Sequence, residues 1–337
     1  MLYLSASPDL DRHDTGPDHP ERKERVLAAI RGLMDAGLAD VTKRLQPRRA
    51  TSAELEKVHT KAYLTTLEEF CVAGGGSLDS DTVVSEGSWD TALLAAGGTL
   101  AAVDAVSKAG EGVGFACHRP PAHHATAYQA MGFCLLNSIA VAAATLIERG
   151  ERVLILDWDI HHGNGTQGVF WDDPRVLYVS THLWPLYPAT GSVAATGGLH
   201  AKGLTINIPL PRGVTGDVVG SAYDEIVTPA VENFGPTWVL ISLGLDPHRD
   251  DPLGQWALSS GDFANLAERA KSYAPRPRRI AVVLEGGYDL DAVRNCTGAV
   301  FAELLDRSYR PEPDTSGGPG RDAVERAKRA QVLASTA

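Results

Sequence analysis

Two kinds of apolar pattern alternate along this chain. Short unbroken runs of aliphatic residues, such as residues 153–156, are typical of strands buried on both faces of a sheet. In longer segments the apolar side chains recur at helical spacing, as at Val26, Ile30 and Leu33. The runs predict strands at residues 113–116, 153–157, 176–181, 204–208, 238–243 and 280–284. The periodic segments predict helices at residues 21–35, 89–109, 136–149, 217–233 and 262–273.

Strands that alternate with helices predict an α/β fold, a mostly parallel sheet with helices on both faces. The sequence has no internal repeat and no linker before residue 310, so we expect one catalytic domain over residues 1–310. Residues 311–320 are rich in proline, glycine and aspartate, which predicts a loop. A short polar helix is expected after it, in the C-terminal segment 311–337.

Composition narrows the classes of function. The 337 residues are 44% hydrophobic and 22% charged, as in an ordinary globular protein. A net charge of -11 argues against nucleic acid as a partner, because nucleic-acid-binding surfaces are basic. The four cysteines lack metal-ligand or disulfide spacing, and we find neither a signal peptide nor a membrane-spanning run. We therefore expect a cytoplasmic protein with no membrane partner, and a homo-oligomer stays open.

A metal site is predicted where the strand at residues 153–157 ends. Side chains alternate along an extended chain, so Asp157, Asp159 and His161 share one face. Open α/β sheets bind their ligands at the carboxyl ends of the strands. Two carboxylates and an imidazole suit a divalent metal such as zinc. The alternative is a polar strand end with solvated histidines, which three such residues on one face make less favourable.

Asp246 also follows an apolar run, at residues 238–241. It would complete a set of three protein ligands and leave one position open, the pattern of catalytic zinc. We expect Asp250 and Asp251 to cap the turn that follows rather than to bind metal.

Two further motifs follow predicted strands. His123 and His124 come after the paired prolines at 120–121, and a neutral imidazole is a natural general base near pH 7. Tyr288 follows two glycines, which allow its hydroxyl to point into a cleft. In isolation, a histidine pair is more often a surface feature, and a tyrosine of this kind is more often part of a turn.

These clusters, in this order, resemble the histone deacetylase superfamily, which includes bacterial deacetylase-like amidohydrolases and acetylpolyamine amidohydrolases. The stretch from Asp157 to Asn164 is similar to the class II branch. The resemblance covers nearly the whole chain and rests also on His19-Pro20-Glu21, Arg25, His59, Tyr63, the stretch from Gly132 to Asn137, Tyr187-Pro188, Thr190-Gly191 and residues 207–210.

The resemblance implies an arginase-like three-layer sandwich with a central, mostly parallel, eight-stranded sheet. It implies zinc-dependent removal of an acetyl or other acyl group from an N-acyl-lysine-like amide by metal-activated water. The zinc ligands would be Asp159, His161 and Asp246. A structural potassium ion is implied at Asp157 and at backbone carbonyls near Ser180 and Thr181.

The resemblance also assigns roles to the other site residues. His123 pairs with Asp157, His124 pairs with Asn164, and Tyr288 donates a hydrogen bond to the substrate carbonyl. The narrow acyl-lysine tunnel is formed by Gly132, Phe133 and Tyr187. Ala122 departs from the family pattern, which usually has glycine before the histidine pair.

Alternatives remain for the reaction. Acetylpolyamine-specific relatives tend to carry an acidic residue where Leu253 stands, so Leu253 favours an acyl-lysine substrate over a polyamine. A biosynthetic small-molecule amide remains open as a substrate. An arginase-like ureohydrolase would need two manganese ions, and a catalytically silent acyl-lysine-binding protein would have lost a ligand, the base or the tyrosine.

Overall fold

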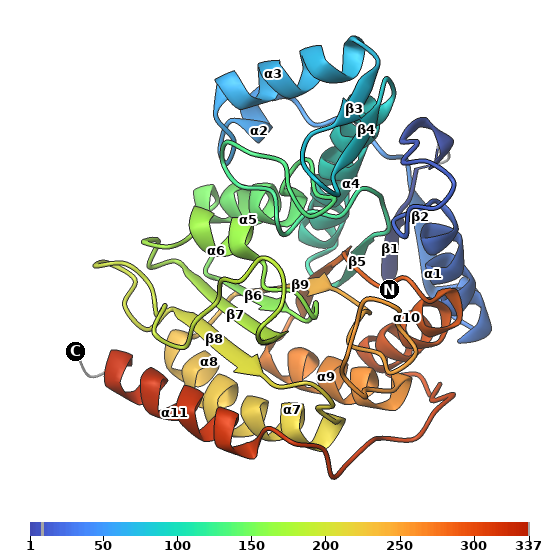
Figure 1. The fold of residues 1–337 in the computed structure, drawn as a ribbon. Helices are drawn as coiled ribbons and strands as arrows, with labels where there is room; N and C mark the ends of the chain where they lie inside the picture. The colour runs from blue at the N-terminus through green and yellow to red at the C-terminus, as the bar shows by residue number, and fades with distance from the viewer. Residues whose placement is uncertain (8–9, 336–337) are drawn as a thin grey trace.

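A computed structural model of the chain describes residues 1–7 and 10–335. An eight-stranded sheet occupies its centre and a small two-stranded sheet lies beside it (Figure 1). The strands are β1 Leu2–Ser5, β2 Thr42–Leu45, β3 Gly75–Ser77, β4 Val83–Ser85, β5 Gly112–Ala116, β6 Val153–Asp157, β7 Val176–Leu183, β8 Thr205–Leu210, β9 Trp238–Leu243 and β10 Arg279–Leu284. The central order is β2-β1-β5-β10-β9-β6-β7-β8, and its neighbouring strands pair in parallel.

Helices cover both faces of the central sheet (Figure 1). They are α1 Glu24–Asp35, α2 Ser52–Leu55, α3 Lys61–Val72, α4 Ser88–Ala109, α5 Ser138–Glu148, α6 Asn164–Val169, α7 Gly216–Ala222, α8 Thr228–Phe234, α9 Ser260–Tyr273, α10 Leu290–Leu304 and α11 Arg321–Ser335. Short 3-10 helices lie at Leu10–Arg12 and Ala39–Val41, and a π-helix at Tyr223–Val227.

The sheet separates two hydrophobic cores. Val153 and Ile155 of β6 face the core that α2–α5 cover. Leu154 and Leu156 face the other core, which α1 and α7–α11 cover. Because alternate residues of one strand enter different cores, the central strands read as unbroken apolar runs. The predicted α/β fold is confirmed.

The predicted elements largely match. The strands at 153–157 and 238–243 have the predicted bounds, and the other four shift or extend by one or two residues. The helix predicted over 217–233 consists of α7, the π-helix and α8. The π-helix ends two residues before Pro229, which has no N–H for the regular ladder. The pattern gave no prediction for β1, β2, α3 and α10.

α4 spans 22 residues and, by length and composition alone, is apolar enough to cross a membrane, although the sequence predicted no such run. In the structure its residues Ala96, Leu100 and Val103 are buried in the core that α2–α5 cover. α4 is thus a core helix of the fold. All four cysteines are buried and unpaired.

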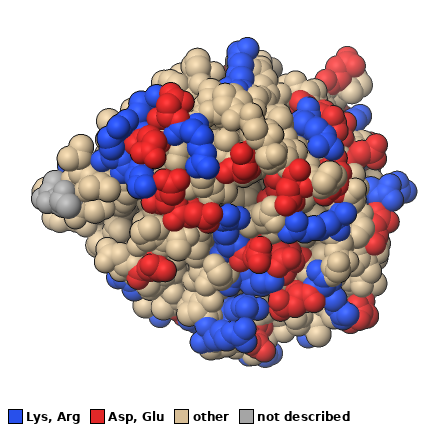
Figure 2. All heavy atoms as spheres, turned by 90° about the horizontal axis from the view of Figure 1, so that it is seen from below, with Lys and Arg blue, Asp and Glu red and all other residues tan. Residues whose placement is uncertain are grey.

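α11 lies below the sheet with α7 and α8 (Figure 1). The face of the molecule seen from below mixes cationic and anionic side chains (Figure 2). Two ion pairs join the helices on this side of the sheet: Glu225 pairs with Lys328 of α11 at 2.8 Å, and Asp224 pairs with Arg269 of α9 at 2.8 Å. This face therefore carries both signs of charge side by side.

Candidate active site

Three predicted metal ligands converge at the carboxyl ends of β6 and β9. The two strands are neighbours, so the loops that carry Asp159 and Asp246 start side by side. The Nδ1 atom of His161 lies 3.0 Å from Oδ1 of Asp159 and 3.1 Å from Oδ2 of Asp246. One ligand atom from each residue lies within 4.8 Å of the other two. Two carboxylates and an imidazole in this arrangement fit a small divalent cation.

The backbone orients the two carboxylates. Asp159 Oδ2 accepts a hydrogen bond from the Gly286 amide at 2.8 Å, and Asp246 Oδ1 accepts one from the Ile160 amide at 2.9 Å. A Cβ atom at Gly286 would lie 2.4 Å from Asp246 Oδ2 and 2.6 Å from Asp159 Oδ2, so only glycine fits here. Burial and the charge of Asp159 raise the pKa of Asp246 to about 7. A cation between the two carboxylates would relieve the repulsion between their negative charges.

The histidine pair lies beside the metal ligands, and each imidazole has a different partner. His123 Nδ1 lies 3.1 Å from Asp157 Oδ2, and His124 Nδ1 lies 2.8 Å from Asn164 Oδ1. Burial alone would lower the pKa of His123, but the charges of Asp157 and Asp159 raise it well above its usual value. Burial, together with the neighbouring imidazoles, holds the pKa of His124 well below its usual value. His123 is therefore the more basic imidazole of the pair and His124 the less basic one.

Asp157 has further partners. The Tyr178 hydroxyl donates to its Oδ2 at 2.9 Å, and the Asp159 amide donates to its Oδ1 at 3.3 Å. Asp157 also stands opposite Ser180 in the pairing of β6 and β7. Ser180 and Thr181, the residues expected near a potassium ion, are both buried there. The sequence gave no sign of Tyr178, which comes from the neighbouring strand.

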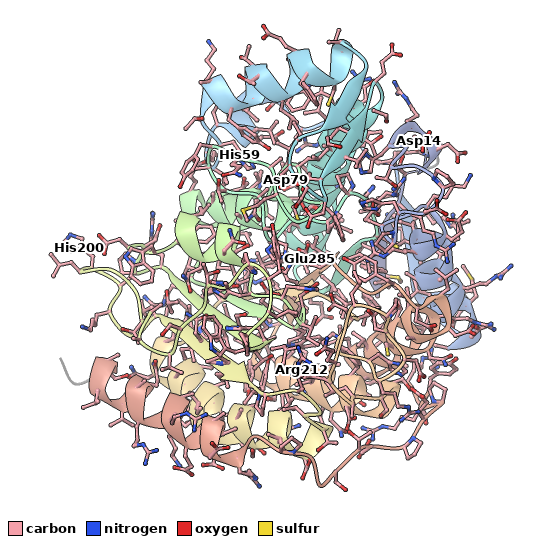
Figure 3. All side chains as sticks on the ribbon, in the orientation of Figure 1. Asp14, His59, Asp79, His200, Arg212 and Glu285 are labelled. Carbon is pink, nitrogen blue, oxygen red and sulfur yellow. The ribbon has the colours of Figure 1, made fainter. Side chains whose placement is uncertain are left out.

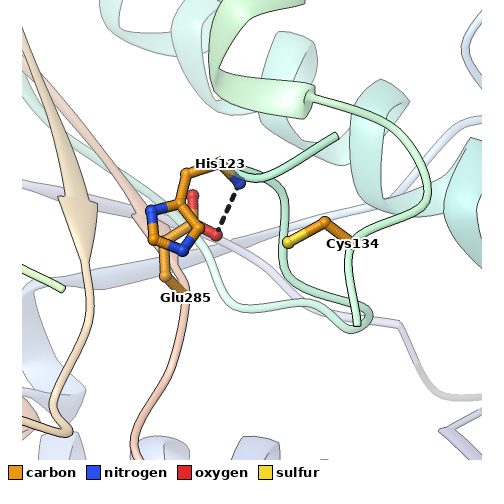
Figure 4. A group of neighbouring side chains, drawn as sticks. All are labelled: His123, Cys134 and Glu285. Carbon is orange, nitrogen blue, oxygen red and sulfur yellow. Dashed lines mark hydrogen bonds between the residues drawn. The ribbon is translucent and has the colours of Figure 1, made fainter. Parts of the chain in front are cut away.

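Glu285 follows β10 and lies near the centre of the molecule in Figure 3. Its carboxylate is fully buried and accepts hydrogen bonds from the amides of Ala122 at 2.6 Å and His123 at 3.1 Å, and from the Ser242 hydroxyl at 3.0 Å. Burial raises the pKa of Glu285 to about 7. Figure 4 shows the bond from the His123 amide. Glu285 thus fixes the loop of the histidine pair, including the unusual Ala122.

Figure 4 also shows Cys134 near His123 and Glu285, a second group that could hold a metal ion by proximity. The donors around it argue against that use. Glu285 already accepts three hydrogen bonds, and the Cys134 thiol donates to the Gly132 carbonyl at 3.4 Å. Burial raises the pKa of that thiol well above its usual value, so it stays protonated. The cluster of Asp159, His161 and Asp246 is the better metal site.

Tyr288 is held from two sides. Asp251 Oδ2 accepts the Tyr288 amide at 2.6 Å, and the Arg25 guanidinium lies 4.8 Å from the centre of the Tyr288 ring. Arg25 donates to the Gly287 carbonyl at 2.5 Å and contacts Glu21 at 3.3 Å. Asp251 also caps the following turn through the amides of residues 253 and 254, as predicted. Its bond to Tyr288 is a second role, which the sequence did not indicate.

A cavity of about 280 Å³ opens onto these groups. The four residues predicted to contact substrate all line it, namely Gly132, Phe133, Tyr187 and Leu253. So do His123, His124, Asp159, His161, Gly286 and Tyr288. Asp81, for which no role was predicted, adds a carboxylate to this lining. The predicted ligand Asp246 is not part of the lining but lies next to it, with its Oδ2 atom 3.1 Å from His161 Nδ1. Asp157 and Asn164 also lie behind the lining, as partners of His123 and His124.

Gly132 lets two rings of the cavity approach each other. Its φ is +54°, and a Cβ there would lie 2.4 Å from His124 Cδ2 and 2.9 Å from Tyr187 Cε1. Phe133 has a φ of +67°, a conformation rarely adopted by residues other than glycine. Its ring packs edge-on against Tyr288, with the ring centres 5.9 Å apart.

A family model of the histone deacetylase domain matches residues 19–304. The chain belongs to the histone deacetylase family. It is 41% identical over 285 residues to a probable deacetylase of Archaeoglobus fulgidus, which covers 83% of this chain and 79% of that protein. It is 38% identical over 295 residues to a histone deacetylase-like amidohydrolase of Pseudomonas aeruginosa, covering 85% of this chain and 76% of that protein.

The HDA15 HD domain, a solved structure, matches this chain with a TM-score of 0.90 and 31% sequence identity. The match covers 98% of this chain and 95% of that domain. The family resemblance inferred from the sequence motifs is therefore confirmed, as is the eight-stranded fold. Membership of the histone deacetylase family makes the chain a hydrolase that acts on amides.

Proposed function

We propose that this protein is a zinc-dependent deacetylase that removes an acetyl or other acyl group from an N-acyl-lysine-like side chain. The observation that carries the proposal is the joint placement of a three-ligand metal cluster, a histidine pair and Tyr288 around one cavity. Asp159, His161 and Asp246 would hold the zinc. Bound there, the metal would supply a Lewis acid for the amide carbonyl and a water of lowered pKa.

His124 is suited to accept the proton of the attacking water. Asn164 Nδ2 points to the His124 carbonyl at 3.4 Å, which assigns Oδ1 of Asn164 to the imidazole. Because Oδ1 can only accept, His124 Nδ1 carries the proton and Nε2 keeps a free lone pair. The lowered pKa keeps His124 neutral and ready to act as a base.

His123 and Tyr288 would act on the departing and developing charges. The raised pKa of His123 keeps a proton on the imidazole, which can stabilise negative charge or protonate the leaving amine. The Tyr288 hydroxyl would donate to the amide oxygen as negative charge builds there. A donor of this kind contributes about 3 kcal/mol in the transition state.

The cavity lining supports an aliphatic substrate stem that ends in the acyl group. Phe133 and Tyr187 supply aromatic walls, and Leu253 is apolar where a polyamine would need a carboxylate for its second ammonium. Acetylated polyamines and other small amides are the alternative substrates. Asp81 is the carboxylate of the lining that would favour a cationic substrate.

Two other activities fit the site less well. A ureohydrolase with two bridged metal ions needs more carboxylates than the two of the Asp159–His161–Asp246 cluster as the structure describes it. A catalytically silent acyl-lysine reader would lack a ligand, the base or the tyrosine, and here each is present.

We also infer a potassium ion beside Asp157, held chiefly by backbone carbonyls near Ser180 and Thr181. The two oxygens of Asp157 already accept hydrogen bonds from His123, Tyr178 and the backbone, so the carboxylate would add mainly charge. Replacing potassium with a large organic cation in the assay buffer should change turnover. Unchanged turnover would count against this ion.

A substrate panel tests the proposal. Metal-free protein, reloaded with zinc, is given an acetyl-lysine peptide, a longer acyl-lysine peptide and an acetylated polyamine. We expect the acetyl-lysine peptide to have a higher kcat/KM than the polyamine, and Tyr288→Phe to lose most of that activity. Preference for the polyamine would change the substrate class, and no turnover of any acyl amide would favour the silent reader.

A further inference from the structure

The segment between α10 and α11 crosses the outside of α9 and α7 before α11 begins (Figure 1). We call residues 312–318 the C-terminal strap, which lies beyond residues 19–304 of the family match. Thr315 donates through its hydroxyl to Asp262 of α9 at 2.7 Å, and the Gly318 amide donates to Thr215 at 2.8 Å. The strap is therefore fastened to the first turns of two helices.

Glu312, the first residue of the strap, joins three groups. Its Oε2 accepts from His248 Nε2 at 2.9 Å and from the Ser260 amide at 2.8 Å. Its Oε1 accepts from the Arg249 guanidinium. Ser260 is the first residue of α9, where the helix dipole favours a carboxylate. The Glu312 side chain is only 15% exposed, and His248 is buried.

His248 carries this contact into the loop of the active site. The Asp250 amide donates to His248 Nδ1 at 3.2 Å, so Nδ1 bears no proton and Nε2–H points to Glu312. Both hydrogen bonds of the ring are thus assigned. The next residue, Asp251, accepts the amides of Leu253 at 2.9 Å and Tyr288 at 2.6 Å.

We propose that Glu312 is a positioning residue for amide hydrolysis, acting through His248 and the turn at residues 248–254. By holding that turn it keeps Asp251 on the Tyr288 amide and keeps Leu253 in the cavity lining. The proposal rests on the role of Tyr288 under the proposed function. His248, Asp250 and Glu312 also lie close enough to hold a metal ion, but N–H donors of the protein already occupy the acceptor atoms of His248 and Glu312.

The pair of variants Glu312→Ala and Glu312→Gln separates positioning from bulk stability. A glutamine can keep its oxygen at the Oε2 position and serve both His248 and Ser260, although its NH2 group cannot replace Oε1 as the acceptor of Arg249. Alanine serves none of the three groups. A misplacement of about 1 Å near the chemistry can cost about 100-fold in rate, and for this more distant contact we expect about tenfold. Glu312→Ala should therefore lose about tenfold in kcat with little change in KM or zinc content, and Glu312→Gln should stay within about threefold of the wild type.

Glu325→Gln on the exposed side of α11 is the matched control and should behave as the wild type. If the effect passes through His248, then Glu312→Ala combined with His248→Ala should lose no more kcat than the worse single variant. A kcat within twofold of the wild type in Glu312→Ala would overturn the proposal. So would equal losses in the alanine and glutamine variants accompanied by lost zinc.

Amide hydrogen exchange gives a readout that does not depend on turnover. In Glu312→Ala the amides of Leu253, Gly254 and Tyr288 should exchange faster than in Glu325→Gln, at a temperature where both variants are folded. Unchanged exchange at these amides would overturn the positioning role even if the wild type proved inactive. Inactive wild-type protein with faster exchange in Glu312→Ala would instead refute the proposed function and leave the strap contact supported.

Discussion

Replacing Gly286 with alanine should destroy the metal site although no ligand residue is replaced. The added Cβ would lie 2.4 Å from Asp246 Oδ2 and 2.6 Å from Asp159 Oδ2, whereas ordinary contacts begin at 3.4 Å. The carboxylates would therefore have to retreat by about 0.8 to 1.0 Å, the difference between those distances. Metal–ligand distances are satisfied only within about 0.2 Å.

The expected size of the effect follows from that mismatch. Disturbing the groups that only orient metal ligands costs about 10- to 100-fold in affinity. Because Gly286→Ala displaces two ligands themselves, we expect a loss of zinc affinity of at least about 100-fold, or about 2.8 kcal/mol. Competition with a chromophoric chelator measures the affinity, and turnover of an acetyl-lysine peptide should fall in parallel.

Gly168→Ala is the matched control. A Cβ at Gly168 in α6 meets no atom within 4 Å, so this variant should keep wild-type zinc affinity and activity. Circular dichroism of the metal-free proteins checks that both variants fold. If Gly286→Ala bound zinc with wild-type affinity and remained active, the ligand set inferred here would be wrong.

Four further predictions follow from particular residues. Each carboxylate oxygen of Asp251 accepts hydrogen bonds from two backbone amides, and asparagine keeps only one of these oxygens. Asp251→Asn should therefore lose two charge-assisted hydrogen bonds, or about 3 kcal/mol of stability in urea unfolding, and a loss under 1 kcal/mol would contradict this. Tyr288→Phe should lower kcat by about 100-fold with KM changing less, and a near-normal kcat would remove the hydroxyl from the mechanism. Leu253→Glu should raise kcat/KM for acetylated polyamines relative to acetyl-lysine peptides several-fold, through a pair worth about 1 kcal/mol that weakens with salt; an unchanged ratio at low salt would show that this position does not select the substrate. Burial lowers the pKa of His118 from 6.5 to about 4, so the stability due to its neutral form is complete above pH 6.5 and is lost as the pH falls towards 4; His118→Gln should flatten that part of the curve of Tm against pH, and an unchanged slope would contradict the assignment.

The central strands could be predicted because burial on both faces makes each an unbroken apolar run. The edge strand β2 is polar and partly exposed, and α10 is buried around much of its circumference, so neither has a periodic signal. The proximity of the three candidate metal ligands could also be predicted from the sequence. Asp159 and His161 alternate after one strand, and Asp246 follows another, so the parallel sheet brings them together.

The contacts that orient the site could not be predicted in the same way. Asp251 reaches the amide of Tyr288 across 37 positions of sequence, and Glu285 reaches the amide of His123 across 162. Such bonds depend on loop geometry. The donor is a backbone amide, which almost every residue has, so no residue type in the sequence marks the partner of the carboxylate. For the same reason the sequence left the strap around Glu312 as a loop without a role.

A zinc titration of metal-free protein tests the central claim most directly. Turnover of an acetyl-lysine peptide is followed as zinc is added. The variant Asp246→Ala, which lacks one of the three metal ligands, is the reference. If Asp159, His161 and Asp246 form one catalytic zinc site, activity should rise linearly and stop rising at one zinc per chain, and Asp246→Ala should stay inactive. Activity in the metal-free protein, an endpoint at two metals per chain, or full activity of Asp246→Ala would contradict the account.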